Sequence, residues 1–369
     1  MGFAMCQEIK RYLFILPSTT IGGAERVLFN IVRHLGKYTY NSVQVVFITK
    51  SENNDWEAHS WSENVVFKYI NERKEFRGFL KYFLCSLFET SKVYNYAVTT
   101  HVHTNSFICL LRKLKVLNIK KHIVRESTLI FERFSGRQLF VFKLLYRFYS
   151  NIDLLVCQTD EMRLSLLTNV PKLSHFSVRV ISNPLNLEFI RCSLNSSYVD
   201  TDSESFRILY VGRLHKVKRV DLLLMSVFCL KKISDVNFKL IIVGDGPERA
   251  RLAELANSLG VQANVLFLGR LDSPYSIMAS SDLGILVSER EGFPNVLLEM
   301  MCSGTKNIFS TDCTASVLNL PRVNIISSDP DQIANQIHRV ILSNSDNSDF
   351  FKRYATSYDV DRYCDKLFD

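Results

Sequence analysis

The stretch LGILVSEREGFPNVLLE at residues 283–299 joins a short apolar run to a glycine–proline turn and a helical pattern. The run 283–287 has the length and composition of a strand buried in a parallel sheet. In the turn that follows, Pro294 suits the first position of a helix, because the amide hydrogen that proline lacks has no partner there. The stretch therefore predicts one strand–turn–helix unit of an α/β protein.

The same alternation runs along the whole chain, whose 369 residues are enough for two domain cores. A polar, serine-rich stretch at 191–205 interrupts it and predicts a linker. We predict a domain at 1–190, a second at 206–345 and a terminal helical segment at 346–369. Both domains are expected to be Rossmann-like and to face each other across a cleft. The expected strands are 12–16, 43–48, 96–102, 153–157 and 177–181, and then 207–211, 239–243, 264–268, 283–287 and 306–310.

Composition and charge exclude several classes of protein. No apolar run approaches the ~18 residues that cross a bilayer, and no cysteines have C-x-x-C spacing, so we expect a cytoplasmic protein with reduced thiols. Residues 1–190 carry 25 Lys+Arg against 15 Asp+Glu, a net of +10, and residues 191–369 carry 20 against 22, a net of −2. No binding signature accompanies the basic charge, so we do not expect nucleic acid as a partner.

Two basic segments of the first half, 76–82 and 112–115, mix cations with large apolar side chains. A surface that contacts the anionic inner face of the cytoplasmic membrane has this composition. A solvated basic face over a core helix has it too. Both interpretations stay open from the sequence.

Two acids and two cations of the second half are candidates for a binding site. Glu291 falls in the turn at the positive end of the predicted helix, and Glu299 falls about two turns further on. Arg213 and Lys218 follow the strand 207–211, at the edge of the sheet where ligands bind. Such cations can neutralise a diphosphate leaving group, and such acids can bind hydroxyl groups. The alternative is a helix-terminus acid, an exposed helix residue and two surface cations.

The first half offers weaker candidates. Gly22 and Gly23 open a helix after the first strand, where backbone amides can approach an anion, although a plain tight turn has the same sequence. The strand 96–102 places His103 at its carboxyl end, where the imidazole can bind a sugar hydroxyl, whereas His101 is expected to pack or pair locally. No carboxylate or cysteine lies at ligand spacing from this histidine pair, so no metal is expected.

Taken in order, these features resemble the family 4 retaining glycosyltransferases of the GT-B fold, also known as the group 1 or E-x7-E family, over nearly the full length. The resemblance is carried by Gly22-Gly23-Ala24-Glu25, His103, Asn183-Pro184, Gly212-Arg213-Leu214 with Lys218, Gly244-Asp245-Gly246-Pro247, and Glu291 with Glu299.

The resemblance implies transfer of a sugar from a nucleoside diphosphate sugar to a saccharide or polyprenyl-linked acceptor, with retention, in surface polysaccharide or lipopolysaccharide assembly. The donor phosphate would itself take the acceptor proton, so no protein nucleophile, metal or other cofactor is expected. By the same resemblance, the domain at 1–190 is expected to bind the acceptor and the domain at 206–345 the nucleotide sugar, and the final helix is expected to cross back to the first domain. The implied roles are diphosphate binding and charge stabilisation by Arg213 and Lys218, ribose binding by Glu299, contact with the transferred sugar by Glu291 and His103, and amide contacts from Gly22, Gly23, Phe293, Pro294, Asn295 and Val296.

The chain departs from the family pattern at three places. Arg219 replaces a common glycine, Lys306 replaces a common proline, and Thr314-Ala315 replaces a glycine-rich turn. The third departure borders the implied donor site. Two alternatives to a transferase therefore stay open, namely a sugar-nucleotide epimerase or phosphorylase of the same fold, and a non-catalytic partner that binds a nucleotide sugar.

Overall fold

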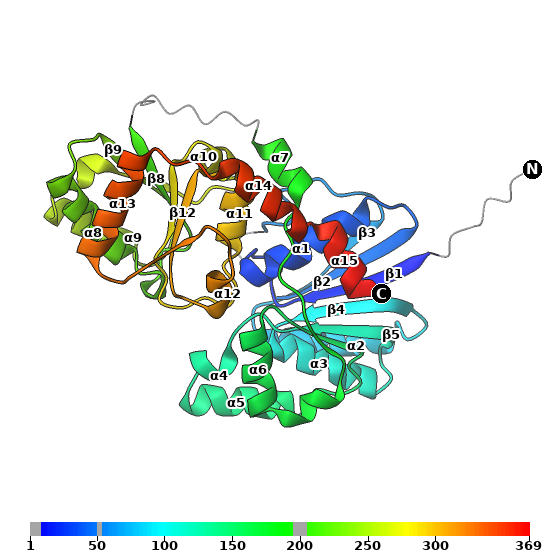
Figure 1. Ribbon diagram of the computed structural model, residues 1–369. Helices are drawn as coiled ribbons and strands as arrows, with labels where there is room; N and C mark the ends of the chain where they lie inside the picture. The colour runs from blue at the N-terminus through cyan, green and yellow to red at the C-terminus, as the bar shows by residue number, and fades with distance from the viewer. Residues whose placement is uncertain (1–8, 50–53, 195–204) are drawn as a thin grey trace, which may run out of the picture. The chain divides into compact units, whose positions relative to one another are not determined.

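The computed structural model describes residues 9–49, 54–194 and 205–369, and the chain divides into two α/β units (Figure 1). The first unit comprises the described residues up to Pro184 together with Val360–Asp369, and the second comprises those of Leu185–Asp359. Every strand pair in both sheets is parallel.

The first unit has a seven-stranded sheet with the order β3-β2-β1-β4-β5-β6-β7. Its strands are β1 (Lys10–Leu16), β2 (Asn41–Thr49), β3 (Val65–Glu72), β4 (Val93–Thr100), β5 (Asn118–Arg125), β6 (Leu154–Cys157) and β7 (Val178–Val180). Its helices are α1 (Gly23–Gly36), α2 (Glu75–Leu87), α3 (Val102–Lys113), α4 (Ile130–Arg133), α5 (Gly136–Tyr146), α6 (Asp160–Asn169), η1 (Pro171–His175) and α15 (Val360–Phe368).

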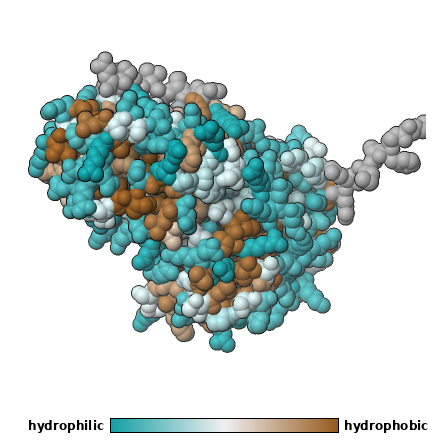
Figure 2. All heavy atoms as spheres, viewed as in Figure 1, coloured by the Kyte–Doolittle hydropathy of each residue, from teal (hydrophilic) through white to brown (hydrophobic). Residues whose placement is uncertain are grey.

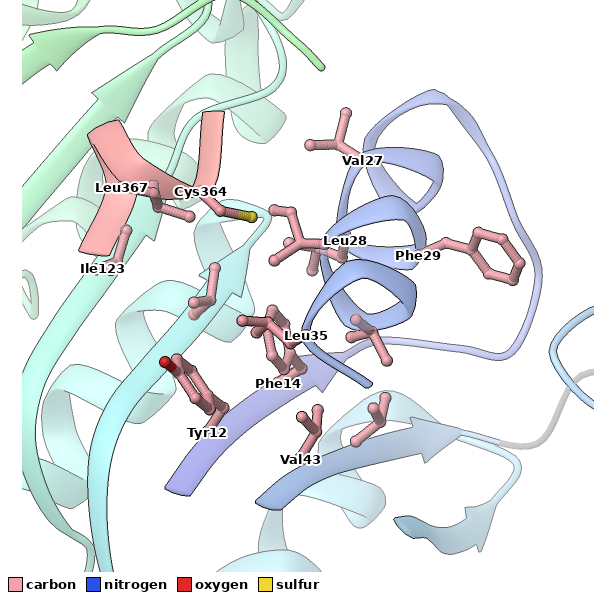
Figure 3. Packing of buried hydrophobic residues seen from close by; sticks show 14 of the residues in the cluster. Tyr12, Phe14, Val27, Leu28, Phe29, Leu35, Val43, Ile123, Cys364 and Leu367 are labelled. Carbon is pink, nitrogen blue, oxygen red and sulfur yellow. The ribbon is translucent and has the colours of Figure 1, made fainter. Parts of the chain in front are cut away.

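Side chains of β1 alternate between two cores, as the period of a strand requires. Phe14 and Leu16 join the core under α1 and α15, whereas Leu13 and Ile15 join the core under α2 and α3. Figure 3 shows the first of these cores, with α1 and α15 packed over the strands. In α15 the buried residues recur with a helical period, at Val360, Tyr363, Cys364 and Leu367.

The second unit has a six-stranded sheet with the order β10-β9-β8-β11-β12-β13. Its strands are β8 (Phe206–Val211), β9 (Phe238–Val243), β10 (Val265–Gly269), β11 (Leu283–Leu286), β12 (Asn307–Thr311) and β13 (Asn324–Ile326). Its helices are α7 (Leu187–Ser193), η2 (Lys216–Lys218), α8 (Val220–Ile233), α9 (Arg249–Ser258), η3 (Gln262–Asn264), α10 (Tyr275–Ala279), α11 (Asn295–Ser303), α12 (Ala315–Leu318), α13 (Pro330–Ser343), α14 (Ser348–Ala355) and η4 (Thr356–Tyr358).

The boundaries of the units differ from the predicted ones. The first unit ends at Pro184 rather than at 190, because Leu185, Leu187 and Ile190 are buried in a core of the second unit. The terminal segment divides as well. Phe351 of α14 joins that same core, and only the residues from Val360 onward pack with the first unit. Most of the predicted linker, at 195–204, lies outside the described residues.

Three strands were not predicted from the sequence, namely β3, β5 and β13. Strand β3 lies at a sheet edge and is largely half-exposed, so its polar and apolar residues do not alternate cleanly. Strand β5 opens with polar and basic residues, and only its last four residues form a buried run. Strand β13 has three residues, of which one is buried.

Candidate functional site

Each sheet has a switch point, a pair of adjacent strands from which the chain continues in opposite directions. In the second unit this pair is β8 and β11, and in the first unit it is β1 and β4. The loops that follow such a pair diverge and leave room for a ligand at the carboxyl edge of the sheet. Most of the candidate residues follow one of these four strands.

The most closely connected pair in the second unit is Lys218 and Glu291. Lys218 lies in η2, in the loop after β8, and Glu291 lies in the loop after β11. The Lys218 ammonium group forms an ion pair with Oε1 of Glu291, and both side chains are mostly buried. Ser288 Oγ donates to the same carboxylate oxygen at 2.6 Å. The switch point of this unit therefore carries a fixed cation and a fixed carboxylate.

The backbone holds this pair in position from two further loops. The amide of Glu291 donates to the carbonyl of Cys313 at 2.9 Å, and the Thr311 hydroxyl donates to the carbonyl of Ser288 at 2.7 Å. The altered Thr314-Ala315 turn follows directly and begins α12, with Thr314 as the N-cap. This departure from the family pattern therefore lies in the loop that supports Glu291.

Arg213 lies two residues after β8 and is exposed. Within the described part of the chain its guanidinium forms no ion pair, so it can bind an anion at the sheet edge. Arg219, which replaces a common glycine, adopts the left-handed conformation that glycine favours, with φ of 50°. Its guanidinium lies 3.5 Å from the carboxylate of Asp221. Lys306 pairs with Asp282 at 2.7 Å.

Two glycine loops pack against each other beside these cations. A Cβ atom on Gly244 would lie 1.9 Å from the carbonyl oxygen of Gly212, and one on Gly246 would lie 2.3 Å from that of Leu214. The Leu214 amide also donates to the Asp245 carbonyl at 2.9 Å. The segment 244–247 thus supports the loop that carries Arg213.

Helix α11 begins one residue later than predicted. Pro294 is the N-cap and Asn295 is the first helical residue, so Glu299 lies about one turn into the helix. The Asn295 amide donates to the Phe293 carbonyl at 3.0 Å, so that amide already has a partner. Phe293 and Val296 pack against the core of the unit.

In the first unit, Gly22 is the N-cap of α1. Its amide donates to Glu25 Oε2 at 3.2 Å. The amide that was predicted to approach a phosphate therefore already has the capping carboxylate as its hydrogen-bond partner. Gly23 is the first residue of the helix. Glu25 Oε1 also lies 2.6 Å from His101 Nε2, and this contact joins the first turn of α1 to the residue that follows β4. Burial opposes ionisation of Glu25, but the hydrogen bond and charge of His101 outweigh it and lower the carboxyl pKa.

The predicted position of His103 at a strand end is wrong. Strand β4 ends at Thr100, His101 takes a positive φ of 69°, and His103 lies in the first turn of α3. His103 Nε2 lies 3.4 Å from Glu75 Oε1 of α2, and its ring stacks on Phe142 of α5 at 6.4 Å. Burial lowers the pKa of His103, although Glu75 opposes that shift.

A cavity of about 200 Å³ opens beside His101 and His103. Its wall includes Glu126, which follows β5 and is 2% exposed. The hydroxyls of Tyr149 and Tyr146 donate to the two oxygens of Glu126, at 2.6 and 3.1 Å. Burial raises the pKa of Glu126 to about 7, against the effect of these hydrogen bonds. This acid was not predicted from the sequence because β5 was not predicted, although a short apolar run before a charged residue was the available signal. The cavity is lined by His101, Val102, His103, Glu126, Ser127, Thr128, Ile130, Arg133, Phe134 and Phe142.

No group of three or more His, Cys, Asp or Glu side chains in the described ranges is placed to hold a metal ion. The same ranges contain no helix that is both long and apolar enough to span a bilayer.

The two sheets, their connections and their switch points define a GT-B fold. The structure of HepE from Anabaena in complex with UDP-glucose matches 97% of this chain and 98% of its own, with a TM-score of 0.79 and 16% identity. Residues 198–357 match the family model of the glycosyl transferases group 1. This family domain lies within the second unit and covers less than half of the chain.

Three relatives show how far the similarity extends. N-acetyl-alpha-D-glucosaminyl L-malate synthase of Bacillus anthracis is 38% identical over 30% of this chain and 28% of its own length. The 4-alpha-N-acetylgalactosaminyltransferase of Campylobacter jejuni, which is named for a diphospho-undecaprenol substrate, is 34% identical over 28% of this chain and 31% of its own. The putative glycosyltransferase EpsF of Bacillus subtilis is 26% identical over 84% of this chain and 81% of its own. The matches thus span about a third or less of the first two relatives and most of the third.

Proposed function

We propose that this protein transfers a sugar from a nucleoside diphosphate sugar to a saccharide or polyprenyl-linked acceptor, with retention of the anomeric configuration. Surface polysaccharide or lipopolysaccharide assembly is the proposed setting. The observation that carries the proposal is the Lys218–Glu291 ion pair at the switch point of the second unit, with the exposed Arg213 beside it. The complex of HepE with UDP-glucose, a protein of the same fold, supports a nucleotide-sugar donor.

The proposed chemistry uses the charges that are in place. Arg213 and Lys218 bind the diphosphate and stabilise the negative charge that grows as it leaves. Glu291 contacts the transferred sugar, and Glu299, one turn into α11, binds the ribose hydroxyls. His103 contacts the sugar from the first unit. A phosphate oxygen of the donor takes the proton of the attacking hydroxyl, so Glu291 does not act as a nucleophile and its ion pair with Lys218 is retained.

Turnover of the donor tests the proposal without knowledge of the acceptor. The protein is incubated with UDP-, GDP-, ADP- and dTDP-sugars, and the released nucleotide and the anomer of the first-formed sugar are followed by NMR. We expect one nucleotide series to be hydrolysed slowly with retention, and Arg213→Ala to slow it by about 10²-fold. Lys216→Ala changes an exposed neighbour in η2 and is the matched control.

Other outcomes identify the alternatives. Conversion of the donor sugar to its epimer would make the protein an epimerase, and turnover that requires inorganic phosphate would make it a phosphorylase. Tight nucleotide binding without any turnover, with or without a saccharide acceptor mixture, would support the non-catalytic partner. Each of these results contradicts the transferase.

A peripheral contact with an anionic membrane is part of the proposal, and α2 supports it. Gly78 and Tyr82 of this helix face the sheet, and a Cβ on Gly78 would lie 2.5 Å from the Ile48 carbonyl. Phe76 and Leu80 lie on the opposite side and are 80% and 50% exposed. Leu84, Phe88, Arg73, Lys74 and Arg77 are exposed as well. Figure 2 shows apolar side chains among polar ones on the visible surface.

The other predicted basic segment contributes less. Arg112 is mostly buried, because its guanidinium forms an ion pair with Asp153 and donates to the Ile119 and Lys120 carbonyls. Arg112 therefore fits neither a solvated basic face nor a membrane contact, and α2 is the proposed membrane face.

Vesicle sedimentation tests this face. The full chain should bind phosphatidylglycerol vesicles at low salt, ignore phosphatidylcholine vesicles and dissociate as salt rises. The double variant Phe76→Ser/Leu80→Ser should weaken binding, whereas Leu342→Ser, at a 68% exposed position of the second unit, should not. Equal binding by both variants would remove α2 from the proposal.

A further inference from the structure

The cavity beside His103 has a chemistry that the donor site does not use. It lies at the carboxyl edge of the first unit's sheet and combines a buried acid, an exposed cation and two aromatic rings. We propose that it binds one sugar ring of the acceptor together with an adjacent phosphate, through Glu126, Arg133 and the rings of Phe134 and Phe142. This inference rests on the proposed transferase function and names the class of its acceptor.

Glu126 supplies the hydroxyl-binding group. Burial of a carboxyl is unfavourable unless hydrogen bonds compensate it, and here two tyrosine hydroxyls approach one oxygen each. A carboxylate oxygen accepts more than one hydrogen bond, so capacity is left for a donor that enters the cavity. Sugar hydroxyls are such donors. The tyrosines fix the carboxyl in place, which preserves its geometry when the cavity is empty.

Arg133 supplies the site for the anionic group. It lies at the end of α4 and is exposed, and its guanidinium lies 5.4 Å from the centre of the Phe134 ring. Among the described residues it forms no ion pair with a carboxylate. A planar guanidinium that an aromatic ring orients is well suited to bind phosphate oxygens in pairs.

The aromatic rings and the volume limit the ligand to one sugar. The ring centres of Phe134 and Phe142 lie 4.7 Å apart at a tilt of 43°, and His103 also stacks on Phe142. Rings arranged in this way can contact the apolar face of a sugar. A volume of about 200 Å³ is below the range of pockets that enclose drug-sized ligands. The occupant is therefore a sugar phosphate unit, whether free or carried on a lipid diphosphate.

Ligand binding to the full chain tests the assignment. The probes are N-acetylglucosamine 1-phosphate, glucose 1-phosphate, their methyl glycosides and inorganic phosphate, and saturation-transfer NMR gives the affinities. We expect at least one sugar phosphate to bind about tenfold or more tightly than its methyl glycoside and than phosphate alone. The same sugar on a short prenyl diphosphate shows whether the natural ligand is lipid-linked or free. Tighter binding than that of the sugar phosphate indicates a lipid-linked acceptor, and equal binding indicates a free sugar phosphate.

Variants separate this cavity from the donor site, which also binds phosphate. Arg133→Ala should weaken sugar phosphate binding about tenfold or more and leave nucleotide binding unchanged, whereas Arg213→Ala should do the reverse. Arg137→Ala removes an exposed cation of α5 outside the cavity and should change neither. Glu126→Gln should weaken the binding of the methyl glycosides as well. The melting curve of this variant shows whether it folds.

Two results overturn the inference. One is the absence of binding by every probe at millimolar concentration. The other is binding that survives Arg133→Ala but is lost in Arg213→Ala, since this places the sugar phosphate in the donor site. Failure of the transferase itself is distinguishable, because it would appear as the absence of nucleotide binding.

Discussion

Lys218 and Glu291 form an ion pair that joins the loops after β8 and β11, the two central strands of the second sheet. The pair holds the Lys218 ammonium at the carboxyl edge before any ligand arrives. In the proposed transferase, a donor diphosphate would meet a cation whose position is already fixed, which is the condition under which charge stabilisation is most effective.

Replacement of Lys218 should affect turnover more than folding. In Lys218→Met the mostly buried Glu291 loses its cation, but Ser288 still donates to it. We expect kcat/KM for donor turnover to fall about 10²- to 10³-fold. Lys216→Met, three residues from Arg213 in the same loop, should retain activity. Equal losses in the two variants would show that the loop, rather than the Lys218 charge, is required.

The close contact of the two glycine loops predicts a loss of stability. Gly244→Ala places a methyl group 1.9 Å from the Gly212 carbonyl, at a φ of 137°, so the loops must move apart. We expect a loss of more than about 2 kcal/mol in the free energy of unfolding. Gly260→Ala meets open space and should lose only the ~1 kcal/mol of its left-handed conformation. Hydrogen exchange of the β9 amides measures the loss of stability in both variants. Equal losses in Gly244→Ala and Gly260→Ala would contradict the close contact of the two loops.

The sequence predicted the positions that carry the clearest periodicity. The alternation of apolar runs predicted ten of the thirteen strands that the described residues form, because most of those strands are buried. It missed β5, whose first half is polar, and so it missed Glu126 and the cavity. It also extended the strand before His103 to residue 102, since nothing in the sequence marks the positive φ of His101 that ends β4.

Partners distant in sequence were beyond this kind of prediction. Lys218 and Glu291 were each identified as candidates, but their ion pair depends on the adjacency of β8 and β11, which periodicity does not encode. The capping of Gly22 by Glu25 could have been predicted from the sequence, because a glycine followed by glutamate three residues later is a local signal.

The Glu126 carboxyl should make the stability of the first unit depend on pH. Its pKa is raised from 4.5 to about 7, so between these values the folded state binds more protons than the unfolded state. Its contribution to the free energy of unfolding is therefore full below pH 4.5 and is lost as the pH rises toward 7. Above pH 7 the free energy of unfolding no longer changes through this group. Relative to Glu126→Gln, the wild-type unit should lose up to ~1.4 kcal/mol per pH unit in this window.

Fluorescence measures this effect in the first unit specifically. The chain has two tryptophans, Trp56 and Trp61, and both lie in that unit. Urea unfolding followed by their emission should show a difference between wild type and Glu126→Gln that changes between pH 5 and 7 and is constant from pH 7.5 to 9. A difference independent of pH would mean that Glu126 keeps an ordinary pKa.

Helix α15 should depend on a buried hydrogen bond to Arg125. Arg125 is fully buried, and it donates through Nε to the Tyr363 hydroxyl and through Nη2 to Asn183 Oδ1, each at 2.9 Å. Tyr363→Phe leaves the Nε donor unsatisfied, so we expect a loss of about 1–3 kcal/mol in the tryptophan-monitored unfolding of the first unit. Tyr354→Phe, which removes a partly buried hydroxyl in the second unit, should leave that transition in place.

Calorimetric titration with nucleoside diphosphates tests the central claim most directly, because it requires neither the acceptor nor the sugar. We expect one of UDP, GDP, ADP and dTDP to bind the wild-type protein. Arg213→Ala and Glu299→Ala should each weaken this binding about tenfold or more, whereas Glu254→Ala, which removes an exposed acid of α9, should not. Absence of binding by all four nucleotides, or binding that neither Arg213→Ala nor Glu299→Ala alters, would contradict a donor site at the switch point of the second unit.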